Sequence, residues 1–291
     1  MSCAFSPEIA VDVEAVLATV HSNIGMPLVA HKVLDLMHSG QVNAHALAAV
    51  IAQDQALALR VLKLANSPYY GFSRRISTVR DAVVILGDKA LRNMVLILAM
   101  KGMHNHFGNT ERLLWEESAA YAMGARFIAE NVPGVHPEEA FMAGLMSNVG
   151  EVVSNNDDPQ RFLMVFDRCR RQNLCDESSC PELPYPFTVL GAAVLSSWNF
   201  SPLLVASLYY VETEDLMGDS EDLLFRLCAV VFLARQLCRS LKLGGYQGST
   251  HPVRAGYSGR ALGLDGTALQ NLQSDFATFF TENAPTLLYP D

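Results

Sequence analysis

The chain has 291 residues, half of them hydrophobic, and a formal net charge of −9 at pH 7. This length can bury a sizeable core in one large domain or two modest ones, and this composition excludes general disorder. The negative charge disfavours binding to nucleic acid over the whole surface, because such binding depends on cations that contact phosphates.

The chain shows no targeting signal that we recognise. Its start, "MSCAFSPEIAVDVEAV", lacks the basic segment that precedes the apolar core of a signal peptide. The most apolar stretch, residues 83–100, contains Asp88, Lys89 and Arg92, which a membrane-spanning helix tolerates poorly. Six cysteines are compatible with a reducing compartment. We therefore expect a cytoplasmic protein without a membrane partner.

Apolar residues recur at helical spacing along most of the chain, and no run shows the strict alternation of a half-buried strand. The pattern predicts an all-α protein. Side chains suited to capping helix N-termini are Asn43, Asp54, Ser77 and Ser201. The expected helices cover about 11–22, 28–39, 43–53, 55–66, 78–86, 88–104, 112–131, 137–153, 158–172, 187–198, 201–213, 220–242 and 266–282.

Charge is distributed unevenly along the chain. Residues 56–102 contain eight bases and two acids, so this stretch carries +6 and the remainder −15. Residues 211–224 contain six acids and no base. The simplest interpretation is solvated faces on separate helices, and the alternative is that the basic stretch forms a docking surface for an acidic partner. If the basic stretch binds a partner, we expect Arg74, Arg75 and Arg80 to contribute, because they fall on a loop and the helix start after it.

Histidines and cysteines offer three candidate metal sites, and the sequence favours none of them. The cysteines lack a paired C-x-x-C spacing, one histidine pair is two residues apart on a predicted helix, and the other has no carboxylate partner on its face. These sets are Cys169, Cys175 and Cys180; His104 and His106; and His31 and His38.

Two polar residues interrupt the apolar helix pattern of "MAGLMSNVGEVV", residues 142–153. Ser147 and Asn148 fall within a run that the periodicity predicts to be buried. A buried polar group costs about 1 to 3 kcal/mol unless it finds a partner. One explanation is local: the serine bonds back to the preceding turn, and the asparagine faces a neighbouring loop.

The segment "VIAQDQALALRVLKLANSPYYGFSRRISTVRDAVVILGDKALRNMVL", residues 50–96, resembles the HDOD domain, the HD-related output domain of bacterial signalling proteins. Its distinguishing features are an acid before a helix (Asp54), a leucine-rich helix that ends in "LANSPYYG", the "ISTVRDAVVILG" cap and helix, and "LRNMVL". The segments "LLWEESAAYAMGARFIAE", "EEAFMAGLMSNVGEVV" and "TVLGAAVLSSWNFSPLLVASLYY" match later helices in order, so the resemblance covers about residues 24–212.

The resemblance offers a second explanation for the polar pair. HD phosphohydrolases, which are similar to HDOD domains, have an adjacent His-Asp pair where this chain has Ser147 and Asn148. They place a histidine upstream, matched by Glu117, and an aspartate downstream, matched near Arg235. A hydroxyl, a neutral amide and a fixed cation are poor ligands for a hard divalent ion. We therefore expect no metal, no cofactor and no catalysis, and we expect Arg235 to replace the ion by pairing with Glu117 and approaching Asn148.

The resemblance implies an HD-like helical bundle with an N-terminal helical subdomain. We expect an N-terminal helix at 1–23, the two halves of the HDOD domain at 24–108 and 109–215, and a helical extension at 216–291. The first functional interpretation is a catalytically inert module that binds protein partners in bacterial signal transduction. The second is an HD-type phosphohydrolase for nucleotides, including cyclic dinucleotides, built from Glu117 and a histidine. A small-ligand sensor that uses the former metal cavity is a third.

Overall fold

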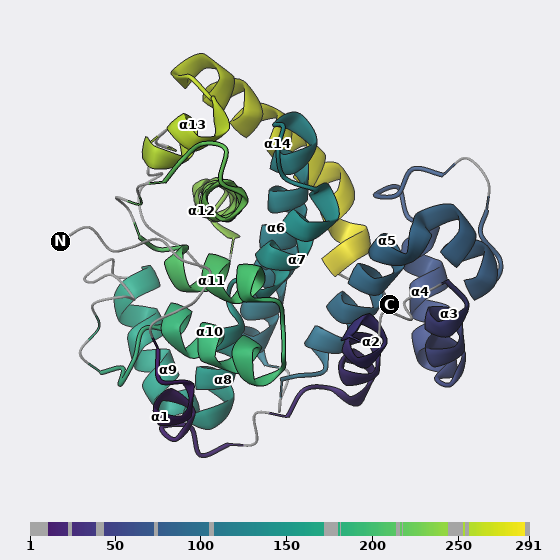
Figure 1. Cartoon of the computed structure of the whole chain (residues 1–291), viewed down its shortest axis with the longest axis horizontal. Helices are drawn as coiled ribbons and strands as arrows, with labels where there is room; N and C mark the ends of the chain where they lie inside the picture. Colours follow the sequence, from purple (N-terminus) through teal and green to yellow (C-terminus); the bar gives the residue numbers. More distant parts are fainter. Residues whose placement is uncertain are drawn as a thin grey trace. The chain divides into compact units, whose positions relative to one another are not determined.

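The computed structural model describes residues 11–22, 25–38, 44–72, 75–104, 108–171, 180, 182–213, 216, 218–243, 253 and 256–288. These residues form α-helices, one short π-helix and no strand, which confirms the all-α prediction (Figure 1). Within these ranges, no helix combines the length and the hydropathy needed to cross a membrane.

The chain forms two compact units, and the larger comprises residues 1–24 and 106–278. Its first helices are α1 (Val13–Leu17), α6 (Asn109–Asn131), α7 (Pro137–Met146), α8 (Val149–Asp157), α9 (Pro159–Phe166) and the π-helix η1 (Asp167–Arg171). They are followed by α10 (Phe187–Ser197), α11 (Pro202–Tyr210), α12 (Leu223–Ser240), α13 (Gly256–Leu262) and the part of α14 (Gly266–Leu288) that ends at Thr278.

Helix α6 forms the centre of the larger unit, because it packs against α7, α8 and α12. Every residue from Glu117 to Ala125 is buried, and most of them are small. Small side chains permit close approach of the neighbouring helices. A Cβ atom at Gly144 of α7, for example, would overlap the carbonyl oxygen of Tyr121 on α6. The polar side chains of Glu117 and Ser118 on α6 lie in the interior of the unit.

The smaller unit comprises residues 25–105 and 279–291, of which the structure describes those up to 288. Its helices are α2 (Leu28–His38), α3 (Ala44–Ala52), α4 (Gln55–Ala65) and α5 (Val79–Lys101), and α5 packs against the other three. The sequence predicts two helices, 78–86 and 88–104, where α5 lies. Gly87 has φ 79° and ψ 170°, so it breaks the helix there, as only glycine does readily.

Asp54 and Ser201 cap α4 and α11 as predicted, with their side chains accepting hydrogen bonds from Leu57 N (3.0 Å) and Leu204 N (3.4 Å). The predicted cap at Ser77 is wrong, because Thr78 Oγ1 accepts the bond from Asp81 N at 3.0 Å. Asn43 lies outside the described residues.

Helix α13 was not expected, since its glycine-rich sequence predicts a loop. It buries Tyr257 and packs against α12, and this tertiary contact outweighs its weak helix propensity.

Two of the predicted domain boundaries, near residues 23 and 108, lie close to the boundaries between the two units. The third, at 215–216, lies inside the larger unit, because α12 packs against α6 and α11.

Candidate functional site

The polar pair Ser147 and Asn148 separates two helices instead of lying within one. Helix α7 ends at Met146 and α8 begins at Val149, so the predicted continuous helix 137–153 is wrong. Asn148 has φ −116° and ψ 17°, outside the helical region. The change of direction brings its side chain against α6, where a polar partner compensates for burial.

Both side chains of the pair are hydrogen-bonded. Ser147 Oγ donates to the carbonyl of Gly144 at 2.8 Å, which is the local bond that the first explanation predicts. Asn148 Nδ2 donates to the carbonyl of Leu114 at 3.1 Å, and its Oδ1 accepts from Ser118 Oγ at 2.7 Å. The asparagine thus ties α8 to a buried helix, and its amide is already committed to protein partners.

Glu117 lies beside this pair and is fully buried. Its Oε2 forms an ion pair with Arg170 Nη1 at 2.7 Å, and its Oε1 accepts a hydrogen bond from the Tyr121 hydroxyl. Arg170, only 2% exposed, also pairs through Nη2 with Glu151. One guanidinium therefore joins a carboxylate of α6 to a carboxylate of α8, the arrangement in which a buried arginine is best satisfied.

Arg235 reaches the same region from α12. Its Nη1 donates to the carbonyl of Ser147 at 3.0 Å, and its Nη2 lies 2.6 Å from Glu212 Oε1 and 3.9 Å from Glu151 Oε1. Its guanidinium also lies over the ring of Tyr121, at 4.9 Å from the ring centroid. The pair that we predicted between Arg235 and Glu117 is wrong. Arg170 of η1 pairs with Glu117 instead, and Arg235 pairs with a different carboxylate, that of Glu212.

That carboxylate, Glu212, follows α11 at the start of the acidic run. It lies between two cations, since Arg239 Nη2 is 3.0 Å from the same Oε1 atom. Burial would raise the pKa of Glu212, but the charges of Arg239 and Arg235 outweigh it and lower the pKa to about 2. Burial likewise opposes the charge of Arg235, and Glu212 outweighs it, so the pKa of Arg235 is raised. This acid is not the solvated side chain that the acidic run predicts.

Charges within the network are balanced. Three carboxylates face three guanidinium groups: Glu117, Glu151 and Glu212 with Arg170, Arg235 and Arg239. A small cavity beside them, lined in part by Ser147, Thr188 and Arg235, has a volume of about 10 Å³, which is close to the minimum for one water molecule.

The residues present do not fit the divalent metal of an HD phosphohydrolase. Such an ion needs several imidazole or carboxylate donors at one point. Here the carboxylates bind arginines, the amide of Asn148 binds α6, and Arg235 introduces a positive charge. Across the part of the chain that the structure describes, no group of three or more His, Cys, Asp or Glu side chains is placed to hold a metal ion.

The other candidate ligands do not join this network. Cys169 and Cys180 are buried, and Cys180 Sγ donates a hydrogen bond to Glu182 Oε2 at 3.0 Å. His31 bonds Asp35 Oδ2 at 2.9 Å on the protein surface. We had expected His31 to lack a carboxylate partner, and that expectation is wrong. His104 is half-buried on the smaller unit. The other candidates, Cys175, His106 and the side chain of His38, lie outside the described residues, as does Arg74. Arg75 and Arg80 of the basic stretch are exposed on the smaller unit.

Sequence reasoning identified Glu117 and Arg235 and missed the other four charged members of the network, Arg239 among them. Helical spacing could have suggested Tyr121, four residues after Glu117, and Glu151, four residues after Ser147. The acidic run drew attention to Glu212 without indicating burial. No signal marked Arg170, because "DRCRR" contains three arginines and the sequence does not show which one a π-helix directs into the core.

Comparison with known proteins identifies the family of the chain. A family model for the HDOD domain matches residues 25–213. The chain belongs to the HDOD domain family. The match covers the smaller unit's helices α2–α5 and the larger unit from α6 to Glu212. Arg235 and Arg239 lie beyond it, on α12, although both contact Glu212.

Solved structures share the fold of this HDOD protein. An HDOD domain protein from Geobacter sulfurreducens is 22% identical, with a TM-score of 0.77 over 95% of this chain and 97% of the other. A protein from Shewanella amazonensis SB2B described as a phosphohydrolase is 22% identical, with a TM-score of 0.71 over 98% and 99%. A protein from Marinobacter aquaeolei VT8 described as a signal transduction protein is 20% identical, with a TM-score of 0.67 over 98% and 64%.

Among curated sequences, an uncharacterized protein of Treponema pallidum (strain Nichols) is 22% identical over 196 residues. The matched region is 64% of this chain and only 37% of that relative.

Proposed function

We propose that this HDOD protein is a non-catalytic signalling module that acts by binding protein partners. The observation that carries the proposal is the charge-balanced arginine and glutamate network, which includes Glu117 and Arg235, two positions that the resemblance matches to metal ligands of HD phosphohydrolases. The guanidinium of Arg170 binds Glu117 and Glu151, and that of Arg235 binds Glu212 and the Ser147 carbonyl. These groups link α6, α8, η1 and α12, which is the role that a structural ion would otherwise have.

Buried ion pairs of this kind explain why a site that catalyses no reaction contains charged residues. Removing one partner from a buried ion pair costs about 3 to 5 kcal/mol, because the other charge is left uncompensated. The carboxylates therefore depend on the arginines, and a metal would have to displace both. The fold of the Marinobacter protein described as a signal transduction protein is consistent with a role in signalling.

The second candidate function is metal-dependent hydrolysis of nucleotides or cyclic dinucleotides, which the Shewanella protein described as a phosphohydrolase brings into consideration. Such hydrolysis would require Glu117 to separate from Arg170 and to bind a metal ion together with a histidine. A sensor of small ligands would also require movement, because the cavity of about 10 Å³ has no room for a ligand larger than a water molecule.

Metal analysis and an activity assay test the proposal together. We expect iron, manganese and magnesium in the purified full-length protein far below one equivalent, and no hydrolysis of a cyclic dinucleotide above the buffer rate after Mn²⁺ is added. Glu117→Gln is the matched variant, because it preserves the shape of the side chain and removes its negative charge. One equivalent of metal that this variant loses, or hydrolysis that it abolishes, would overturn the non-catalytic assignment.

A further inference from the structure

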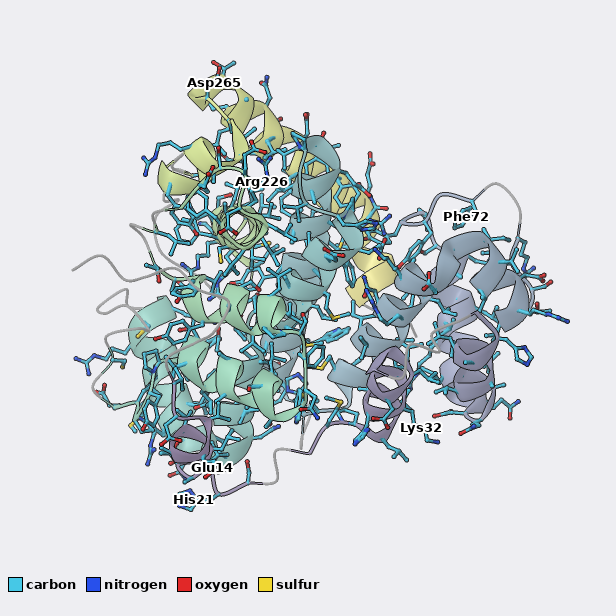
Figure 2. The ribbon with its side chains drawn as sticks, in the orientation of Figure 1. Glu14, His21, Lys32, Phe72, Arg226 and Asp265 are labelled. Carbon is cyan, nitrogen blue, oxygen red and sulfur yellow. The ribbon has the colours of Figure 1, made fainter. Side chains whose placement is uncertain are left out.

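Helices α4 and α5 of the smaller unit, and the loop between them, carry exposed aliphatic side chains and exposed bases. Leu59 and Lys63 belong to α4, Arg75 to the loop after it, and Arg80 and Val84 to α5; we call these five residues the α4–α5 surface. Leu59 is 61% exposed and Val84 is 77% exposed, and the three bases are exposed as well. Phe72, 41% exposed, lies on the same connection and is labelled in Figure 2.

The spacing of these residues places them on shared helix faces. Leu59 and Lys63 are four residues apart on α4, and Arg80 and Val84 are four residues apart on α5, so each helix presents one apolar and one basic side chain in a row. The two helices pack against each other (Figure 1).

The side chain of Asn66, at the C-terminal end of α4, holds the connecting loop in place. Its Oδ1 accepts from Ile76 N and its Nδ2 donates to Ile76 O, both at 2.7 Å. Arg75, adjacent to Ile76, is therefore fixed close to the end of α4 that carries Lys63.

The bases of this surface lack acidic partners. Lys63, Arg75 and Arg80 form no ion pair with any residue within the described ranges. On α6 of the larger unit, by contrast, Arg112 pairs with Glu116 at 2.6 Å and Arg126 with Glu130 at 2.9 Å. Two acids, Asp81 and Asp88, also lie exposed on α5. The three bases of the surface therefore exceed these acids by one positive charge.

We infer that the α4–α5 surface binds an acidic, amphipathic polypeptide segment of a protein partner. Carboxylates of such a segment would pair with Lys63, Arg75 and Arg80, while its apolar face would cover Leu59 and Val84. Exposed aliphatic side chains give a phosphate backbone nothing to bind, and nucleic-acid interfaces are far more positively charged than this one. The inference rests on the proposed function, since it names the partner chemistry of a protein-binding module.

Photo-crosslinking in the cells that produce the protein tests the inference. A benzoylphenylalanine in place of Val84 reports on the α4–α5 surface, and the same residue in place of Leu163, which is 44% exposed on α9, is the matched control. We expect polypeptide crosslinks from the Val84 position, with the crosslinked peptide acidic and apolar in sequence. That peptide is then synthesised and its binding to the full-length protein is measured by fluorescence anisotropy.

Charge reversal provides the decisive comparison. We expect Lys63→Glu with Arg80→Glu to weaken binding of the synthesised peptide at least about tenfold, and we expect salt to weaken binding to the original protein. Lys242→Glu with Arg260→Glu changes the net charge equally at exposed bases of the larger unit and should change the affinity less than twofold.

Several outcomes would overturn the inference: equal weakening by the two double variants, crosslinks from the Val84 position to nucleic acid or to a second copy of this chain, or polypeptide crosslinks from the Leu163 position alone. The last outcome would leave the proposed function standing. No polypeptide crosslink from either position would contradict both the inference and the proposed function.

Discussion

Removal of Arg170 tests the buried network directly. In Arg170→Met the carboxylates of Glu117 and Glu151, at most 1% exposed, lose the guanidinium that joins them. Among the described residues, Arg235 Nη2 still lies 3.9 Å from Glu151 Oε1, and Glu117 keeps the Tyr121 hydroxyl. A buried ion pair that loses one partner costs about 3 to 5 kcal/mol, so we expect the free energy of unfolding to fall by that amount.

A compensated variant separates charge from packing. In Glu117→Gln with Glu151→Gln and Arg170→Met, no buried carboxylate is left without its guanidinium, while Arg235 and Arg239 keep Glu212, so we expect recovery of at least about 2 kcal/mol relative to Arg170→Met alone. Arg112→Met removes the same kind of side chain from a surface pair with Glu116 and should cost less than about 1 kcal/mol.

Urea unfolding followed by tryptophan fluorescence measures these differences. Both tryptophans of the chain, Trp115 and Trp198, belong to the larger unit, so their signal follows the unit that contains the network. With an m-value of about 2 to 3 kcal/mol/M, a loss of about 3 to 5 kcal/mol shifts the midpoint by roughly 1 to 2.5 M. Equal destabilisation by Arg170→Met and by the triple variant would refute the argument, and so would a cost of Arg170→Met no larger than that of Arg112→Met.

Three further predictions concern other features of the chain. The pKa of Glu212 is lowered to about 2 in the folded protein and is about 4.3 in the unfolded chain, so ionised Glu212 contributes about 3 kcal/mol to the free energy of unfolding. This contribution is complete above about pH 5 and is lost as the pH falls towards about 2. Urea midpoints should therefore decrease less with acidification in Glu212→Gln than in the original protein. Gly150→Ala places a Cβ against the backbone of α10, 2.8 Å from Gly191 N, and should cost more than about 2 kcal/mol in urea unfolding, whereas Gly266→Ala meets no atom within 4 Å and should be neutral; similar costs would contradict this packing argument. Asn66→Ala should accelerate hydrogen exchange at Ile76 N at least about tenfold, and an unchanged rate would show that this bond does not hold the loop.

The amino-acid sequence determines the helical class of this protein, because helix formation and burial depend on spacing that is visible along the chain. It also determines local features such as the caps at Asp54 and Ser201 and the break at Gly87, where one side chain or its absence decides the backbone conformation. The HDOD motifs lie mainly in such local features. This is why the family could be inferred from residues 50–96 together with the order of the later helices.

The tertiary structure alone decided the partners within the buried site. Glu117 and Arg170 are 53 residues apart, and Arg235 and Ser147 are 88 apart. Coulomb attraction does not distinguish one arginine from another in a sequence. The choice depends on which guanidinium the packed helices bring within hydrogen-bonding distance, and the π-helix η1 brings that of Arg170 to Glu117 while α12 brings that of Arg235 to Glu212.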